Sequence, residues 1–195
     1  MSIKITSREK ASRRNKQKIY DAALYLFEKY DFDTVTVNDI CRHSKLSKGT
    51  FYHYFNSKED LVVIGFTRGL DRYLKQHYRP SKEKSFEENY IDFIMCMCYY
   101  AESVGKSFTR RSYMAQISTQ VELRIEDRLM VNIIDDLIAE GKKLKLFRFD
   151  YSDLELYTHI VGTFTGLLVK WSTDTKGIID FEHLIKNQFL ALLKI

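Results

Sequence analysis

Apolar residues recur along this chain at helical spacing, with short polar breaks between the runs. The first run places its apolar side chains at intervals of three and four residues, which is the spacing of one buried face of an α-helix. Its members are Ile19, Ala22, Ala23, Leu26, Phe27 and Tyr30. The helices expected from all such runs cover about 13–30, 37–44, 48–55, 58–78, 90–100, 108–117, 121–141, 152–173 and 180–194. The sequence therefore predicts an all-α fold of about nine helices.

Hydroxyl and carboxyl residues three positions apart mark the expected starts of several helices. Such a pair lets the hydroxyl accept a hydrogen bond from an unpaired backbone N–H while the carboxylate accepts one in return. Three pairs have this spacing: Thr36 with Asp39, Ser57 with Asp60, and Ser152 with Glu155. Ser47 is expected to cap the helix that follows it, Pro80 to end the helix before it, and Gly141 to end another.

Two short helices joined by a turn, behind a longer supporting helix, predict a helix-turn-helix unit within the first 60 residues. In the second short helix, Phe51 and Phe55 account for the inward face. Its outward positions are Lys48, Thr50, Tyr52, His53 and Tyr54. Gly49 costs about 1 kcal/mol relative to alanine in a helix, which makes sense where the helix end must lie close to another surface, such as a phosphate backbone.

The positive charge of the chain is concentrated at its beginning. The formal net charge is +5, and the first 20 residues hold seven basic side chains against Glu9. The basic residues are Lys4, Arg8, Lys10, Arg13, Arg14, Lys16 and Lys18. A basic arm would suit a phosphate backbone, because neutralising phosphates releases counterions. A solvated terminus that aids solubility is an equally good interpretation of the charge by itself.

Composition excludes several other classes of protein. One proline and eight glycines among 195 residues argue against turn-rich β-sandwiches and barrels. No apolar stretch reaches the roughly 18–20 residues of a membrane span, and the beginning of the chain does not resemble a secretory signal. Three cysteines, an odd number, fit a reducing compartment, so a cytoplasmic location is expected.

No pattern of catalytic or metal-binding residues stands out. The nucleophile-elbow, P-loop and dinucleotide fingerprints do not occur. Cys41, His43 and His53 have no fourth ligand at zinc spacing, and Cys96 and Cys98 point to different sides of one helix. We expect buried structural thiols, no catalytic residue, no metal and no cofactor.

Residues 36–61, TVNDICRHSKLSKGTFYHYFNSKEDL, resemble the DNA-binding signature of the tetracycline-repressor (TetR-type) family of transcriptional regulators. The resemblance extends over about residues 13–65. It implies a helix-turn-helix DNA-binding domain with a basic N-terminal arm at 1–60, and a helical effector-binding and dimerisation domain at 61–195.

The resemblance also implies which residues contact double-stranded DNA. Thr36 would hold a phosphate with its hydroxyl and backbone N–H, Asn38 would reach a phosphate or base edge, and Lys58 would hold a phosphate. At the start of the recognition helix, Lys48, Gly49 and Thr50 would enter the major groove. Tyr52 and His53 would contact phosphates, base edges or thymine methyl groups. Whether Tyr54 contacts DNA or packs on the preceding helix is left open.

The remainder of the chain is expected to serve regulation and self-association. Gly162 and Gly166 lie four apart in an apolar helix, and the last helix is apolar to its end. In the family resembled, the last two helices, here about 152–173 and 180–194, form a four-helix dimer bundle. Packing within one chain is the alternative. An effector pocket could be lined by Phe93, Met97, Tyr100, Tyr113, Met114 and Trp171, which could equally be core residues.

The function implied is a homodimeric repressor that leaves a palindromic operator when a small apolar or aromatic effector binds. The alternative is an architectural or adaptor DNA-binding protein that a protein partner regulates. An internal cavity would favour the first, and a filled core with an exposed apolar patch would favour the second.

Overall fold

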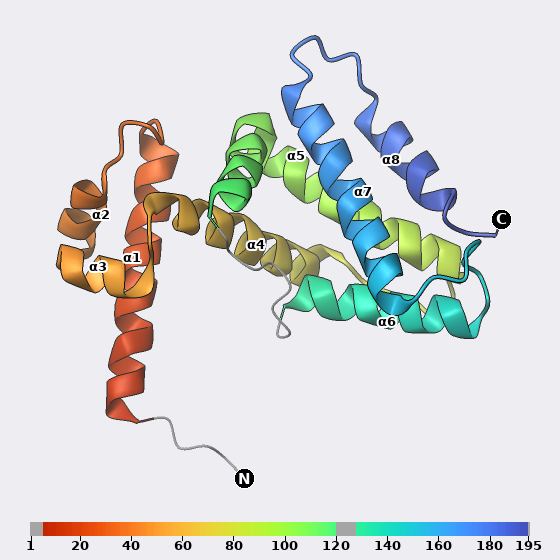
Figure 1. Cartoon of the computed structure of the whole chain (residues 1–195), viewed down its shortest axis with the longest axis horizontal. Helices are drawn as coiled ribbons and strands as arrows, with labels where there is room; N and C mark the ends of the chain where they lie inside the picture. Colours follow the sequence, from red (N-terminus) through yellow and green to blue (C-terminus); the bar gives the residue numbers. More distant parts are fainter. Residues whose placement is uncertain (1–5, 120–127, 195) are drawn as a thin grey trace. The chain divides into compact units, whose positions relative to one another are not determined.

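A computed structural model describes residues 6–119 and 128–194 of the chain, and every regular element in these two ranges is helical (Figure 1). The helices are α1 (Ser7–Lys29), α2 (Val37–Ser44), α3 (Lys48–Tyr54), α4 (Lys58–His77), α5 (Phe86–Ser118), α6 (Leu129–Lys143), α7 (Asp153–Thr173) and α8 (Phe181–Leu190). The predicted all-α class is confirmed. Among the described residues, no helix combines the length and apolarity needed to cross a membrane.

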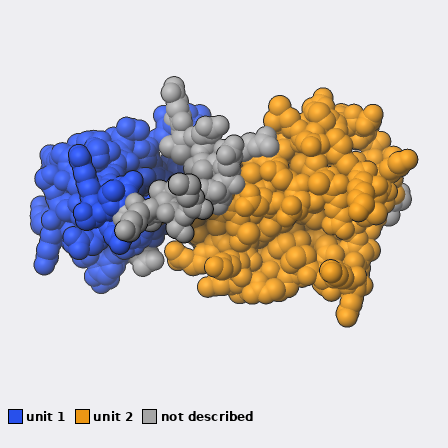
Figure 2. Space-filling model, turned by 90° about the horizontal axis from the view of Figure 1, so that it is seen from below, with its two compact units in different colours: residues 1–65, 115–121 blue, residues 66–114, 122–195 orange. Residues whose placement is uncertain are grey.

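The chain divides into two compact units, coloured separately in Figure 2. Unit 1 comprises Met1–Gly65 with Ala115–Val121, and unit 2 comprises Phe66–Met114 with Glu122–Ile195. The core of unit 1 joins α1, α2 and α3 to the first turns of α4. The fully buried side chains of this core are Ile19, Ala23, Ile40, Phe51 and Leu61. The functional division expected between residues 60 and 61 stays a prediction.

Helix α1 begins earlier than the apolar pattern predicts. Thr6 caps it with a full capping box, because the Thr6 hydroxyl accepts from the Glu9 N–H at 3.2 Å and the Glu9 carboxylate accepts from the Thr6 N–H at 2.7 Å. The expected start at residue 13 was therefore wrong. From Ser7 onward, the basic residues expected to form an arm lie on the first turns of α1.

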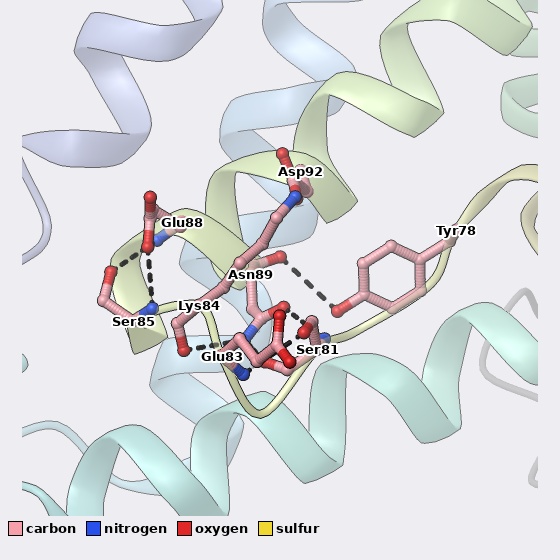
Figure 3. A network of polar contacts seen from close by, with 8 residues as sticks. All are labelled: Tyr78, Ser81, Glu83, Lys84, Ser85, Glu88, Asn89 and Asp92. Carbon is pink, nitrogen blue, oxygen red and sulfur yellow. Dashed lines mark hydrogen bonds and ion pairs between the residues drawn. The ribbon is translucent and has the colours of Figure 1, made fainter.

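The connection between α4 and α5 is held by polar contacts around Asn89 (Figure 3). The Asn89 side chain accepts from the Ser81 N–H at 2.9 Å and donates to the Ser81 carbonyl at 2.8 Å. Its own carbonyl accepts from the Tyr78 hydroxyl at 3.4 Å. Helix α4 ends at His77, before Pro80, as predicted. These bonds fix the turn from α4 into α5.

Helix α5 is interrupted at Gly105, where φ is 82° and ψ is 160°. This backbone conformation is accessible mainly to glycine. The predicted interruption is therefore confirmed, but it lies at Gly105, one residue before the predicted Lys106–Ser107. Past the break, the Lys106 ammonium donates to the Asp174 carbonyl at 2.7 Å, which joins α5 to the end of α7.

Unit 2 is built around a second core of side chains from α4 to α8. Helix α6 is described from Leu129, so the predicted turns before residue 128 lie outside the described residues. Gly141 does not end this helix as expected. It lies inside α6, where a Cβ would stand only 2.7 Å from the Phe86 ring and 2.6 Å from the Phe147 ring. The missing side chain lets these two rings pack against the helix.

The last helix is shorter than predicted, because α8 ends at Leu190 and the chain then pairs with the segment before α7. Phe147 and Leu193 form an isolated antiparallel bridge. The Arg148 N–H donates to the Leu192 carbonyl at 2.9 Å. Leu192 and Leu193 are buried in the core of unit 2. The apolar end of the chain, interpreted above as a sign of self-association, is thus accounted for by packing within unit 2.

Candidate nucleic-acid interface

Helix α3 is fixed in unit 1 by its cap and by two aromatic side chains. Ser47 caps it as predicted, with its hydroxyl accepting from the Thr50 N–H at 3.1 Å. Phe51 and Phe55 are buried in the core of unit 1, also as predicted. With its inward positions filled by these rings, the helix leaves Lys48, Tyr52 and His53 exposed to solvent.

The outward side of α3 brings together most of the residues expected to contact DNA. Lys48, Gly49 and His53 are exposed, and Tyr52 is 55% exposed. Thr50 is half-buried, with its hydroxyl 2.9 Å from that of Ser47. This surface combines a cation, an imidazole and a phenol, which can all bond to phosphates or base edges. That they do so stays a prediction.

Gly49 has no structural reason to be glycine in unit 1. A Cβ at this position would meet only the Ser47 hydroxyl oxygen, at an ordinary contact distance of 3.8 Å. Its φ is not positive, since Gly105 and Gly177 are the glycines with positive φ in the described part of the chain. A residue that costs helix stability without helping the fold is consistent with close approach to an outside surface.

Tyr54 packs within unit 1. Its hydroxyl donates to the Ser12 hydroxyl oxygen at 3.1 Å, joining α3 to α1. The ring is half-buried and meets the His53 ring edge-on at 4.7 Å between centroids. The hydroxyl bond ties Tyr54 to α1, whereas the packing partner expected from the sequence was the preceding helix, α2. The Tyr54 ring also lies against the imidazole of His53.

Thr36 begins α2 with the predicted capping box. Its backbone N–H donates to the Asp39 carboxylate at 3.0 Å, its hydroxyl donates to the same oxygen at 2.5 Å, and it accepts from the Asp39 N–H at 3.2 Å. The Thr36 hydroxyl bond, followed by the backbone bond, lowers the pKa of Asp39. Both donors expected to hold a phosphate are therefore engaged with Asp39. A phosphate contact would have to replace these bonds. Asn38, in the first turn, is exposed.

Lys58 is directed to the backbone of its own unit. Its ammonium donates to the carbonyl of Phe32 at 2.7 Å and to that of Val35 at 2.8 Å, and it lies 4.4 Å from the centre of the Phe32 ring. These contacts hold the loop between α1 and α2 to the start of α4. An ammonium has three donors, so one remains for the predicted phosphate contact.

Lys45, which the sequence pattern did not single out, has a left-handed backbone with φ of 58°. It ends α2, and the following Leu46 N–H donates back to the Cys41 carbonyl at 3.1 Å. This is the hydrogen-bond pattern of a Schellman cap, in which glycine is usual. The apolar Leu46 just after the expected helix end was the signal in the sequence for such a cap.

Five of the six residues proposed to line an effector pocket are buried in the core of unit 2, and Met114 is 64% exposed. The buried five are Phe93, Met97, Tyr100, Tyr113 and Trp171. Trp171 stacks on Phe181 with ring centroids 4.9 Å apart, and the Lys106 ammonium lies 5.5 Å from its ring. The Tyr100 hydroxyl donates to the Phe66 carbonyl at 3.0 Å. The structure does not bring Met114 to the other five.

The residues expected to support self-association divide into two groups. Gly162 and Gly166 on α7 face open space, since a Cβ at either position would meet nothing within 4 Å. Leu154 and Val169 on the same helix are 62% and 41% exposed. The residues at the chain end, by contrast, are buried in their own unit.

The three cysteines are free and buried, as expected of structural thiols. Burial raises the pKa of Cys96 to about 11 and raises that of Cys98 further. Thiols held in the neutral form are poor nucleophiles and poor metal ligands. Within residues 6–119 and 128–194, no group of three or more His, Cys, Asp or Glu side chains is placed to hold a metal ion.

Comparison with known proteins identifies the helix-turn-helix region. Residues 19–63 match the family model described as "Bacterial regulatory proteins, tetR family". The fatty acid metabolism regulator protein of Bacillus subtilis is 24% identical over 143 residues, which cover 68% of this chain and 70% of that protein. The regulator UidR of Escherichia coli is 25% identical over 103 residues, covering 53% of this chain and 50% of that protein.

Solved structures with the same fold cover nearly the whole chain. A TetR-family transcriptional regulator from Haemophilus influenzae is 17% identical with a TM-score of 0.59, covering 94% of this chain and 99% of its own. The repressor FadR of Thermus thermophilus, solved with lauroyl-CoA, is 19% identical with a TM-score of 0.57, covering 91% and 92%. FadR of B. subtilis, solved with stearoyl-CoA, is 21% identical with a TM-score of 0.53, covering 91% and 97%.

Proposed function

We propose, from the premise that residues 19–63 form a DNA-binding domain of the tetR family of bacterial regulatory proteins, that this chain represses transcription by binding a palindromic operator as a homodimer. The observation that carries the proposal is the outward side of α3. Phe51 and Phe55 hold the helix in the core, while Lys48, Tyr52 and His53 remain available to a ligand. Docked in a major groove, the N-terminal end of such a helix meets base edges.

A second copy of the chain would supply the other half-site. The exposed side of α7, with Leu154, Val169 and two glycines open to solvent, supports α7 as the main dimerisation surface. The outward residues of α8, among them Glu182, Lys186 and Asn187, are polar and exposed. We therefore assign the apolar part of the dimer contact to α7. A two-fold dimer would place two copies of α3 about one DNA turn, roughly 34 Å, apart.

The core of unit 2 is proposed to bind an apolar or aromatic effector. Two of its polar atoms support this, because the Tyr90 hydroxyl and the Ser112 hydroxyl are buried without a hydrogen-bond partner among the described residues. Buried hydroxyls are usually paired, so unpaired ones suit a site that a ligand or water completes. Long-chain acyl-CoA, bound by two of the proteins with this fold, is the first effector to test.

Release would follow from differential affinity. Consider a protein with one conformation of high and one of low operator affinity. An effector that binds the second conformation more tightly increases its population. The population ratio of the two conformations can change by no more than the ratio of the effector's affinities for them. Linkage requires the reciprocal effect: operator DNA must weaken effector binding by the same factor.

The first experiment is anisotropy-detected binding of the purified protein to labelled DNA flanking its own gene, with scrambled DNA as control, across a salt series. Tight binding to one palindromic stretch, with two chains or a multiple of two, supports the proposal. Adding oleoyl-CoA or stearoyl-CoA to that complex then tests release. Equal, weak and steeply salt-dependent binding to both DNAs would contradict sequence-specific repression and favour an architectural protein controlled by a protein partner.

A further inference from the structure

A basic pocket of about 430 Å³ in unit 2 is lined by residues of the end of α6, the loop before α7 and the last described residues. Figure 1 shows these segments of the backbone side by side. Four of its lining residues are cations: Lys142, Lys145, Arg148 and Lys194. Asp150 is the acidic residue among those that line it. The backbone bond from the Lys194 N–H to the Leu146 carbonyl, at 2.7 Å, brings residues nearly fifty positions apart to this place.

Two of the four cations are already engaged, and two are not. The Lys142 ammonium donates to the Asp153 carboxylate at 2.6 Å, and the Arg148 guanidinium donates to the Leu193 carbonyl at 3.5 Å. The side chains of Lys145 and Lys194 have no hydrogen-bond or ion-pair partner within the described residues. The pocket therefore carries uncompensated positive charge, which favours an anionic ligand.

Lys145 occupies its position against the preference of the backbone. Its φ is 56°, and the bonds from the Lys145 N–H to the Lys142 carbonyl and from the Leu146 N–H to the Gly141 carbonyl, each 3.0 Å, form a Schellman cap. Glycine is the usual residue there, and a side chain in this conformation costs about 1 kcal/mol. A strained residue that places an ammonium beside a pocket points to a role other than stability.

An aromatic surface adjoins the charge. Phe149 and Tyr151, both in the pocket lining, stack with ring centroids 5.2 Å apart and an interplanar angle of 24°. Phe149 is 47% exposed, so a second planar ring can stack on it. Phosphate-binding cations next to an aromatic stacking surface are the combination that recognises a nucleotide.

We propose that this pocket binds a nucleoside diphosphate moiety, with Lys145 and Lys194 on the phosphates and Phe149 against the base. The moiety could come from a free nucleotide or from the ADP portion of coenzyme A, since both present an adenine ring and a 5′-diphosphate. Its lining residues differ from those of α3 and from the buried core residues assigned to the effector, so absence of ADP binding would leave operator binding by α3 untouched. Occupation by coenzyme A would instead link this pocket to the acyl-CoA effector of the proposed function.

The test is calorimetric titration of the full-length protein with ADP, compared with tripolyphosphate and with coenzyme A. We expect one ADP per chain, weaker binding of tripolyphosphate, and an ADP affinity that falls with salt. Lys145→Gly should weaken ADP binding about tenfold, the worth of one hydrogen bond to a charged group, without lowering the melting temperature. Phe149→Ser should also weaken it, by about fivefold or more.

Lys45→Gly is the matched control, because it relieves the same backbone conformation in unit 1 and should leave ADP binding unchanged. Coenzyme A that displaces ADP assigns the moiety to a larger ligand, and coenzyme A that fails to displace it assigns the site to a free nucleotide. Absence of saturable ADP binding would overturn the proposal. So would tripolyphosphate binding as tightly as ADP together with no effect of Phe149→Ser, since the pocket would then be an unspecific polyanion surface.

Discussion

Asp71 of α4 caps the first turn of α6, with its Oδ1 accepting from the Met130 backbone N–H at 3.1 Å. The residue at the N-cap position of α6, Arg128, makes no side-chain cap bond of its own. Its guanidinium instead donates to both carboxylate oxygens of Asp71, at 3.3 and 3.4 Å. One carboxylate of α4 thus satisfies a backbone donor and a mostly buried cation of another helix.

Asp71→Ala is therefore expected to lower the free energy of unfolding by about 2–4 kcal/mol, because it removes a helix cap and leaves a desolvated guanidinium without its carboxylate. Urea unfolding followed by circular dichroism measures this. Asp92→Ala is the control, since it breaks an ion pair with Lys84 in which both side chains are well exposed and which should be worth less than about 1 kcal/mol. Equal losses in the two variants would contradict the capping role.

Gly49→Ala should separate stability from DNA binding. The added methyl group meets only an ordinary contact, so helix propensity should raise the stability of unit 1 by up to about 1 kcal/mol. Operator affinity should fall, because the same methyl group would stand between α3 and the DNA. If the variant is more stable and binds the operator as tightly as the parent protein, Gly49 does not lie in the DNA interface.

Tyr52→Ala should weaken binding to the operator by about tenfold or more while changing binding to random DNA much less, because it removes groove contacts at small cost to the fold. Tyr54→Phe is the matched control. It removes the bond to Ser12, at a cost of about 1 kcal/mol in stability, and should not alter discrimination between the two DNAs. If Tyr52→Ala lowers the affinity for the operator and for random DNA by the same factor, Tyr52 contacts only phosphates.

Lys58→Met keeps the apolar stem and removes the ammonium. Loss of two hydrogen bonds to backbone carbonyls should lower the stability of unit 1 by about 2 kcal/mol. If the third N–H holds a phosphate, the slope of log affinity against log salt should also fall by about one. We expect both changes. If the stability falls but the slope does not change, the role of Lys58 is limited to holding the loop between α1 and α2 to the start of α4.

Alkaline pH should destabilise unit 2 through its buried phenols. Desolvation, with smaller contributions from Asp92 and Glu140, raises the pKa of Tyr78 to about 12. The unfolded chain releases this proton near pH 10, so the stabilising contribution is complete below pH 10 and is lost as the pH rises to 12. Tyr78→Phe should flatten part of this decline. Tyr90 and Tyr113, together with the thiols of Cys96 and Cys98, contribute further to the decline, because burial raises their pKa values as well.

Local patterns predicted most of the helices and their caps. The hydroxyl–carboxyl spacing located the boxes at Thr36 and Ser152, and Phe51 with Phe55 located the inward side of α3. The same spacing occurs at Thr6 and Glu9, within the basic segment interpreted as an arm, and there it begins α1. Exposed basic residues at helical positions cost a helix little, so charge was a poor guide to its start.

Contacts between distant residues could not be predicted from one sequence. The Lys58 ammonium reaches a carbonyl 26 positions away. The pairing of Phe147 with Leu193 is a single bridge, too short to produce an alternating pattern of apolar residues in the sequence. Gly141 was assigned to a helix end by its residue type, whereas its reason is the close approach of two rings. In each case the determining partner lies outside the window in which periodicity or capping acts.

Trp171 is the single tryptophan of the 195 residues, and it is buried between Phe181 and the Lys106 ammonium in unit 2. Its fluorescence therefore reports on unit 2 alone, while the helical signal in circular dichroism reports on both units. Recording the two together would show which unit each substitution loosens. Asp71→Ala should shift the tryptophan emission curve, and Lys58→Met should leave it in place, so the indole distinguishes unfolding of unit 2 from unfolding of unit 1.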